Sequence, residues 1–212
     1  ATVSGAAPAS FPTTPGSFAT EGAGGGTDLF ATRMSPFGDR LFYSTFIGGE
    51  RGEDIGCLAL TAQGRVVVAG HVFGPGGYPT TPNAPYPNYI GGQSDAVITV
   101  LDLLLEGVSE HGTSVSGCIG PLRLGVSELA VAGRESFTVY ASGAPPEASG
   151  WLLVSRARSA YASPAGDPRL LVDRSQLLTR IPVQSDATGF TETPFPLTHA
   201  LPGQELHFQY VF

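Results

Sequence analysis

The sequence predicts an all-β protein, and three observations support this fold class. The 212 residues include 29 Gly and 18 Pro, which favour turns over helices. No segment carries apolar residues at the i, i+3, i+4, i+7 spacing of an amphipathic helix. Apolar residues make up 42% of the chain, and they gather in short runs rich in β-branched and aromatic residues. We therefore expect a packed core built from short strands and turns.

The first half of the chain has the pattern of a meander of short strands. Turn residues at 36–39 and 62–64 separate neighbouring runs, and Ala62-Gln63-Gly64 is a tight hairpin signal. We expect strands at residues 28–34, 41–46, 55–61, 65–72 and 95–103.

The first half also repeats itself. Phe11-Pro12-Thr13-Thr14-Pro15 recurs as Tyr78-Pro79-Thr80-Thr81-Pro82, and residues 26–32 recur at 93–99, both with an offset of 67. Val3-Ser4-Gly5 matches Val68-Ala69-Gly70 at an offset of 65. Three blocks in the same order at nearly constant offset indicate an internal repeat.

Residues 1–107 resemble the SBBP family of β-propeller repeats. The shared features are the FPTTPG segment, Gly-Gly-x-Asp before a strand, the Ser-Pro-x-Gly turn and Tyr-Ser-Thr-x-x-Gly-Gly. The resemblance implies partial β-propeller-like blades, about one and a half repeats of them, in a large exported bacterial protein. It implies no single activity. Leu101-Asp102-Leu103-Leu104-Leu105 replaces the usual second turn and strand, so we expect the repeats to end near residue 107.

The second half, residues 108–212, is predicted to form an immunoglobulin-like β-sandwich. Turn signals separate its apolar runs at the spacing of sandwich strands. The expected strands are residues 122–126, 136–141, 151–155, 170–173, 177–183 and 206–212.

The last of these strands alternates between two faces. Leu206, Phe208, Tyr210 and Phe212 share one face, which we expect to be buried. His207 lies on the other face, so we expect it to be solvated or at an interface.

This half is similar to a C-terminal domain of exported proteins of planctomycetes and myxobacteria. The likeness lies in the Gly117-Cys118-Ile119-Gly120 opening and in the turn at Asp186-Ala187-Thr188-Gly189. It implies export and a structural or anchoring role rather than a reaction. A second cysteine that such domains carry before Leu170 is missing here, because Pro168-Arg169 occupies the place.

The charge balance excludes two classes of partner. The net charge is −7 and the sequence pI is about 4.9, so the chain lacks the basic surface that binds nucleic acid or anionic membranes. No apolar stretch of 18 residues could span a bilayer as a helix. The first residues lack a signal-peptide pattern and an initiator Met, so we expect a processed product or a fragment. The two resemblances imply an exported bacterial protein, located outside the cell or at its surface.

Catalytic motifs are absent from the sequence, and we expect neither catalysis nor a cofactor. There is no G-x-S-x-G elbow, no P-loop and no pair of His at metal-ligand spacing. One acidic loop with Glu50, Glu53 and Asp54 has the donors of a Ca²⁺ site. The alternative, which we favour, is a solvated loop whose charge is offset by Arg51.

Two cysteines, Cys57 and Cys118, allow a single disulfide within the chain. The alternative, which we favour, is a buried Cys57 thiol in its apolar run and a Cys118 that is free or paired externally.

These features predict a non-catalytic structural or interaction module. Isolated blades cannot close a core, so some sheet faces need cover from elsewhere, and open sheet edges pair with partners. We expect a subunit of a surface assembly, filament or larger complex, with copies of itself or other proteins as partners. The candidate contact residues are Leu206, Phe208, Tyr210 and Phe212 of the last strand and the loop aromatics Tyr78, Tyr86 and Tyr89.

For these contact residues a plainer interpretation is favoured. The last strand is then an ordinary sandwich strand, and each Phe/Tyr-Pro-Thr-Thr-Pro loop folds back to cover its own blade. Two rival functions remain open: a carbohydrate-binding module that stacks its loop aromatics on glycans, and a non-catalytic fragment of a larger exported enzyme.

Overall fold

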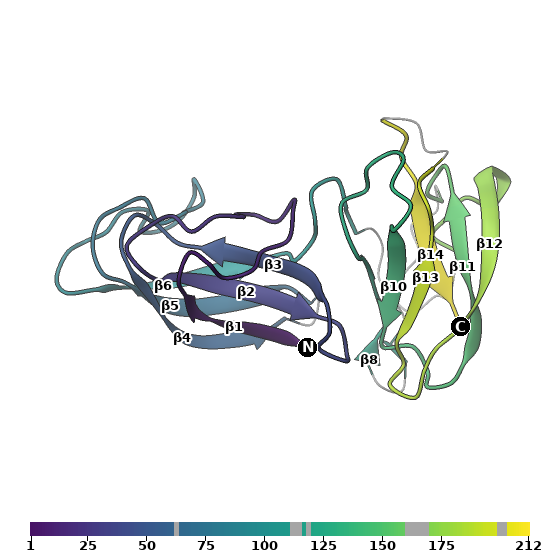
Figure 1. Cartoon of the computed structure of the whole chain (residues 1–212), viewed down its shortest axis with the longest axis horizontal. Coiled ribbons are helices and arrows are strands. Elements are labelled where there is room, and N and C mark those ends of the chain that lie inside the picture. The colour runs from purple at the N-terminus through teal and green to yellow at the C-terminus, as the bar shows by residue number, and fades with distance from the viewer. Residues whose placement is uncertain (62–63, 111–115, 118–119, 160–169, 199–202) are drawn as a thin grey trace. The chain divides into compact units, whose positions relative to one another are not determined.

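The structure, a computed structural model, describes residues 1–61, 64–110, 116–117, 120–159, 170–198 and 203–212. These residues form antiparallel sheets and one short 3-10 helix, with no α-helix, and none of the sheets closes into a barrel. The predicted all-β class is therefore confirmed. The chain divides into two compact units, residues 1–106 and 107–212 (Figure 1).

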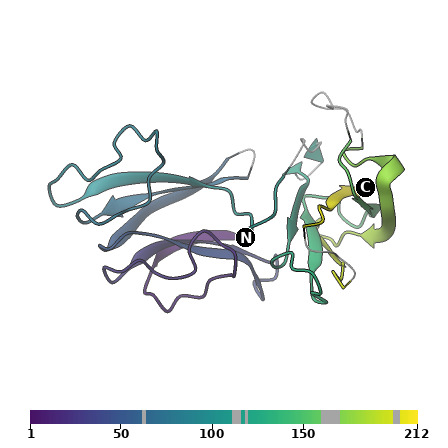
Figure 2. The ribbon, with the colours of Figure 1, turned by 90° about the horizontal axis from the view of Figure 1, so that it is seen from above.

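The first unit contains two three-stranded sheets, which form separate layers in Figure 2. Sheet I has the order β1-β2-β3, and sheet II has the order β4-β5-β6. The strands are β1 (Thr2–Ala7), β2 (Asp28–Met34), β3 (Leu41–Ile47), β4 (Glu53–Leu60), β5 (Val66–Val72) and β6 (Asp95–Leu101).

The repeat in the sequence reappears as a repeat in strand register. Strands β1 and β2 of sheet I pair with Val3 opposite Thr32. Strands β5 and β6 of sheet II pair with Val68 opposite Thr99, which are the equivalent residues at offsets of 65 and 67. Thus β5 corresponds to β1, and β6 corresponds to β2.

The two sheets pack face to face through small and branched apolar side chains. Leu29 of β2 lies against β5, where a Cβ added to Gly70 would be 3.2 Å from its Cδ1 atom. Ala31, on the same face as Leu29, is fully buried, as are Val66 and Val68 on the facing side of sheet II. The core of this unit therefore lies between the inner faces of the two sheets.

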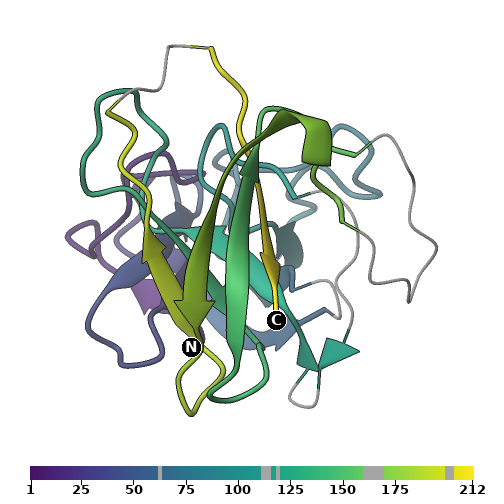
Figure 3. The same ribbon diagram turned by 90° about the vertical axis from the view of Figure 1, so that its right-hand side faces the viewer.

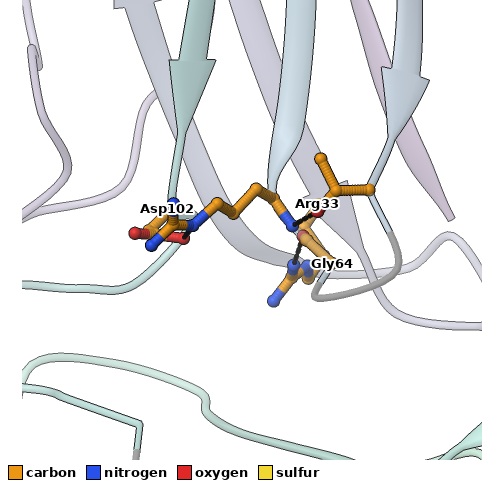
Figure 4. A network of polar contacts seen from close by, with 5 residues as sticks. Arg33, Gly64 and Asp102 are labelled. Atoms are coloured by element: carbon orange, nitrogen blue, oxygen red, sulfur yellow. Dashed lines mark hydrogen bonds and ion pairs between the residues drawn. The ribbon is translucent and has the colours of Figure 1, made fainter.

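Polar contacts hold one end of this stack together. Arg33 of β2 donates from Nη2 to the Gly64 carbonyl oxygen at 3.3 Å, linking sheet I to the turn between β4 and β5 (Figure 4). Nearby, Arg65 Nε donates to Asp102 Oδ1 at 3.0 Å (Figure 4), an exposed ion pair that contributes little to stability.

The Phe11 loop covers the outer face and the free edge of sheet I. The Phe11 ring stacks on Phe30 with centroids 4.1 Å apart and meets Phe46 edge-on. The Thr14 amide donates to the Ser44 carbonyl of β3 at 3.0 Å. The loop therefore folds back onto its own sheet.

The second unit contains two further three-stranded sheets, ordered β13-β10-β9 and β12-β11-β14, and a short β7-β8 pair (Figure 3). Its elements are β7 (Ser116–Gly117), β8 (Gly120–Pro121), β9 (Arg123–Val126), β10 (Thr138–Ser142), β11 (Ser149–Ser155), the 3-10 helix η1 (Arg174–Gln176), β12 (Leu177–Gln184), β13 (Thr191–Pro194) and β14 (His207–Val211).

One tyrosine joins these two sheets through the core. The Tyr210 hydroxyl of β14 donates to the Val139 carbonyl of β10 at 2.8 Å and lies 2.9 Å from Thr193 Oγ1 of β13. Burial raises the pKa of Tyr210 to about 12, with the nearby Glu192 charge adding to the shift. The hydroxyl therefore stays protonated and bonded inside the unit.

Two predictions for the second unit are wrong, and a single segment explains both. Residues 170–173 make only an isolated bridge at Val172 rather than a strand. The Leu171 and Val172 amides instead lie within 2.7 and 3.3 Å of Gln209 Oε1 on β14. Because Gln209 shares its face with His207, this segment lies over that face, and His207 is buried rather than solvated.

Candidate interaction surface

The outer face of sheet II is apolar and open to solvent. Strand pairing sets six side chains in two parallel rows on this face, which we call the sheet II outer face: Cys57, Ala69 and Ile98 in one row and Ala59, Val67 and Val100 in the other. Ile98 is 75% exposed and Val100 is 53% exposed. Adjacent exposed apolar residues of this kind mark interaction sites more often than isolated ones do.

A third row on this face is more polar. Asp54, His71 and Ala96 lie opposite one another at the end of the sheet where β4 begins, and all three are exposed. The surface is thus an apolar centre with a polar border on one side, which is the usual arrangement of a protein interface.

Equivalent positions in sheet I show what covers such a face. Ala31 occupies in β2 the repeat position of Ile98 in β6, yet Ala31 is fully buried because sheet II packs on it. On the outer face of sheet I, the exposed residue belongs to the first repeat and the buried equivalent to the second. Val68 is fully buried by sheet I, whereas its equivalent Val3 is 40% exposed. Sheet II therefore exposes a face whose counterpart in sheet I is buried, whereas on the outer face of sheet I, which the Phe11 loop covers, Val3 is exposed at the edge.

The edge of β6 is open in the same way. Within the described residues β6 pairs with β5 alone, whereas β2 pairs with strands on both sides. In the described part of the chain no counterpart of β3 follows β6, so the loop after Tyr78 has no fourth strand of this kind to pack on. Its Tyr86 is 79% exposed, and its Ile90 is also exposed.

The three predicted loop aromatics have different environments. The Tyr78 hydroxyl lies 2.7 Å from Thr99 Oγ1 of β6, and burial raises its pKa although this hydrogen bond lowers it. Tyr89 donates to the Gly92 carbonyl at 2.9 Å. Only Tyr86 presents most of its ring to solvent, so it alone of the three is well placed to meet a ligand.

The predicted contact residues of the last strand are used inside the second unit. Phe208 meets the rings of Phe137 and Phe195 at centroid distances of 6.5 and 5.1 Å. Tyr210 is buried, and Phe212 stacks on it at 6.1 Å. Leu206 is half-buried just before β14. Strand exchange through this segment would first have to open the core of the unit.

The acidic loop does not bring its three predicted Ca²⁺ ligands together. Glu50 and Asp54 are exposed, while Glu53 is buried at the start of β4. Nowhere in the described part of the chain do three His, Cys, Asp or Glu side chains gather in a group that could hold a metal ion.

Glu53 instead forms a buried carboxyl pair with Asp28 of β2, which the sequence reasoning missed. Burial raises the pKa of Glu53 to about 7; the Gly49 amide at 3.1 Å opposes the shift and the Asp28 charge adds to it. Burial also raises the pKa of Asp28. Gly48 packs against the pair, where any Cβ would collide with Asp28. The pair thus joins the start of β2 to the start of β4. One proton held on the Glu53 carboxyl group allows a hydrogen bond between the two carboxyl groups.

Cys57 is exposed and free, so the prediction that its thiol is buried is wrong. The reason is its register on β4, which places the side chain in the open row beside Ala69 and Ile98. Cys118, its predicted disulfide partner, lies outside the described residues.

One exposed aromatic of the second unit was also missed. Trp151 of β11 is 43% exposed, and the Arg180 guanidinium of β12 lies 5.2 Å from the centre of its ring. Leu152 and Val154 point into the core, so the alternation along this strand could have placed Trp151 on the opposite face.

Comparison with known proteins adds no relative: no family model, curated protein or solved structure matches the chain. The described residues include no helix of the length and apolar character needed to cross a membrane.

Proposed function

We propose that the chain is an exported, non-catalytic structural module that acts as a subunit of a larger assembly. The single observation that carries this proposal is the apolar, solvent-exposed outer face of sheet II. Ile98 and Val100 are exposed on this face, and covering them with a partner lowers the free energy because apolar surface is removed from water.

The proposal includes an architecture for the first unit. Matching the repeats by strand register gives a shared set of four strands; among the described residues, sheet I lacks a counterpart of β4 and sheet II lacks a counterpart of β3. Four-stranded sheets packed face to face around an axis are the blades of β-propellers. The identical pairing of β1 with β2 and of β5 with β6 supports two blades of this type, each short of one strand.

For the second unit we propose a β-sandwich. Support comes from the two three-stranded sheets and from Tyr210, whose hydroxyl reaches from one sheet to the backbone of the other. In this reading the unit is a compact anchor or spacer, and the contacts that build the assembly are made by the first unit.

The test is whether association covers the sheet II outer face. In a Cys118→Ser background, Cys57 becomes the only thiol and reports directly on that face. We expect light scattering to show a mass that grows with protein concentration, and Cys57 alkylation to slow at least tenfold as it grows. A monomer at every concentration with a constant alkylation rate would contradict the proposal.

Glycan binding is a second candidate function, favoured by the exposure of Tyr86 and Trp151. Exposed aromatic rings stack on sugar faces, and Arg180 beside Trp151 adds donors for hydroxyl groups. A glycan array on the intact chain, repeated with Tyr86→Ala and Trp151→Ala, tests it. Binding that neither substitution weakens would argue against these rings as the site.

A further inference from the structure

Two loops of the first unit share their internal hydrogen bonds. We call residues 12–23 the first loop and residues 79–90 the second loop, and they are equivalent at the repeat offset of 67. The matching bonds are Thr13 Oγ1 to Thr20 O and Thr80 Oγ1 to Pro87 O, Ser17 N to Thr14 O and Ala84 N to Thr81 O, and the amides of Ala23 and Ile90 to the carboxyl groups of Asp28 and Asp95. The two loops therefore have the same shape, and each is tied in the same way to the first residue of its own strand, β2 or β6.

In the first repeat this loop holds β3 in place. The Ser44 amide of β3 donates to Thr14 Oγ1 at 2.9 Å, and the Phe46 amide donates to the Ala19 carbonyl at 3.0 Å. The loop returns a bond, since the Ala19 amide donates to Thr45 Oγ1 at 2.8 Å. Strand β3 pairs with β2 along its other side. The first loop and β2 thus bind the two edges of one strand.

The equivalent groups of the second loop have no strand to bind. Thr81 and Tyr86 hold the repeat positions of Thr14 and Ala19. In the part of the chain that the structure describes, neither the Thr81 amide and hydroxyl nor the Tyr86 amide and carbonyl make a hydrogen bond to another residue. Thr81 and Tyr86 are exposed, whereas Thr14 and Ala19 are half-buried. The second loop therefore leaves in water the groups that β3 occupies in the first repeat.

The edge of β6 is open toward the same place. Because the Ser44 and Phe46 amides point to the first loop, the Thr45 amide between them points to β2, where Thr45 lies opposite Ala31. Residues that are opposite one another in such a pair exchange both backbone bonds, so the Ala31 amide points to β3. Ile98 holds the position of Ala31, and its amide therefore points out of the edge that β6 leaves unpaired among the described residues.

The side chains around this edge indicate what would fit it. In the first repeat Thr32 Oγ1 lies 2.8 Å from the Ser44 hydroxyl of β3. Thr99 is the equivalent of Thr32, and its hydroxyl, which Tyr78 already contacts, can take part in a further hydrogen bond. The stretch 96–100 carries no charged side chain. An uncharged extended segment with a hydroxyl residue at the place of Ser44 is thus suited to this site.

We propose that the edge of β6 at residues 96–100 and the second loop together form a slot for an extended segment of a partner protein, which adds to sheet II as an antiparallel strand with the residue pattern of β3. This rests on the proposed function and names the kind of partner for it. The β3 strand of a second copy is a poorer occupant, because Phe46 and Ile47 are fully buried in its own unit and would have to leave the core.

The probe is a fluorescein-labelled peptide with the sequence of residues 40–48, and its binding to the intact chain is followed by fluorescence polarisation. Two further peptides test the two sides of the slot. N-methylation at the place of Thr45 removes the amide that would face β6, and N-methylation at the place of Phe46 removes the amide that would face the second loop. We expect saturable binding of the unmodified peptide and affinities lower by about tenfold or more for both N-methylated peptides.

Variants of the chain test the same two sides. Ile98→Pro removes the outward amide without touching the bonds to β5, and Ile98→Ala, which keeps that amide, is its control. Thr81→Val removes the hydroxyl equivalent to that of Thr14, and Asn83→Ala, at an exposed residue of the same loop, is its control. We expect the peptide affinity to fall about tenfold for Ile98→Pro and about fivefold for Thr81→Val, and to change by less than about threefold in both controls. Far-UV circular dichroism checks folding.

Three outcomes overturn the inference. The first is no saturable binding of the unmodified peptide, and the second is binding that Ile98→Pro and Thr81→Val both leave unchanged, because the peptide then lies elsewhere. The third is self-association of the chain that excess peptide reverses, because a second copy then supplies the strand.

Failure of this inference is distinguishable from failure of the proposed function. A chain that does not bind the peptide but whose association slows Cys57 alkylation keeps the proposed function and loses the slot. A chain that binds the peptide in the predicted way but stays monomeric keeps the slot and contradicts the self-association.

Discussion

The two repeats of the first unit share residues and strand register but differ in what surrounds them. In the first repeat, β2 lies between β1 and β3, and Phe11 seals the outer face. In the second, β6 is an edge strand, and the loop after Tyr78 stands open. The comparison teaches that pairing is encoded locally within each repeat, whereas burial depends on which neighbours are present. Substitutions at equivalent positions can test this separation.

The largest difference is expected between Val68→Asp and Val3→Asp. Val68 is fully buried, so an aspartate there places an unpaired charge in the core and should destabilise the first unit by about 4 kcal/mol or more. Val3 is exposed, and its substitution should cost less than about 0.5 kcal/mol. Urea unfolding at low protein concentration measures both. Equal effects would mean that the two positions have the same environment.

The second-largest difference in stability is expected between substitutions in the two repeat loops. Phe11→Ala removes a ring stacked on Phe30 and in contact with Phe46, and we expect a loss of about 2 kcal/mol. Tyr86→Ala, in the open loop of the second repeat, should change stability by less than about 0.5 kcal/mol. Thermal unfolding provides the comparison, and a costly Tyr86→Ala would show that this loop is packed after all.

The acidic residues that begin β2 and β6 should contribute differently to the pH dependence of the protein's stability. Asp28 faces Glu53, whose pKa of about 7 lies above its ordinary value of 4.5, so the folded state holds a proton that the unfolded state releases. The stability that this proton contributes is complete below about pH 4.5 and is lost as the pH rises through 7. We expect the Tm to fall by several degrees from pH 5 to 8.

The control for this titration comes from the second repeat. Asp95, the equivalent of Asp28, is half-buried and accepts a hydrogen bond from the Ile90 amide at 2.6 Å. Glu53→Gln should therefore flatten the pH dependence of the Tm, while Asp95→Asn should leave it in place. A profile unchanged by Glu53→Gln would refute the buried pair as its source.

The smallest effect is expected at Ile98. In the monomer Ile98→Ala should change stability by less than about 0.5 kcal/mol, because the side chain is already mostly in water. Urea unfolding of dilute protein measures this, and a loss above about 1 kcal/mol would mean that part of the same chain covers the residue.

Local pattern was enough to locate most strands. The run Asp28–Met34 was predicted with the bounds that β2 has, since its apolar content and flanking turns are local signals. The strand β1 was missed, because Thr2–Ala7 is made of small residues with weak strand preference. β1 forms a strand because its backbone pairs with the side of β2 that β3 does not occupy.

Burial could not be predicted in the same way. Alternation shows which side chains share a face, but it does not show whether another segment lies over that face. For this reason Cys57 was placed inside and His207 outside, and both are reversed. The Asp28–Glu53 pair was missed because its members are 25 residues apart and meet only when sheets I and II stack.

The change of offset from 65 to 67 between the repeats has a structural consequence. The two additional residues fall between Val72 and Tyr78, where the first repeat has a shorter link from Ala7 to Phe11. Since the ladders on either side keep the same pairing, this link tolerates a change of length without cost to the sheet. The longer link instead gains contacts of its own with the loop before β4: the Glu50 amide donates to the Gly76 carbonyl at 2.6 Å, and Arg51 Nε donates to the Pro75 carbonyl at 3.3 Å.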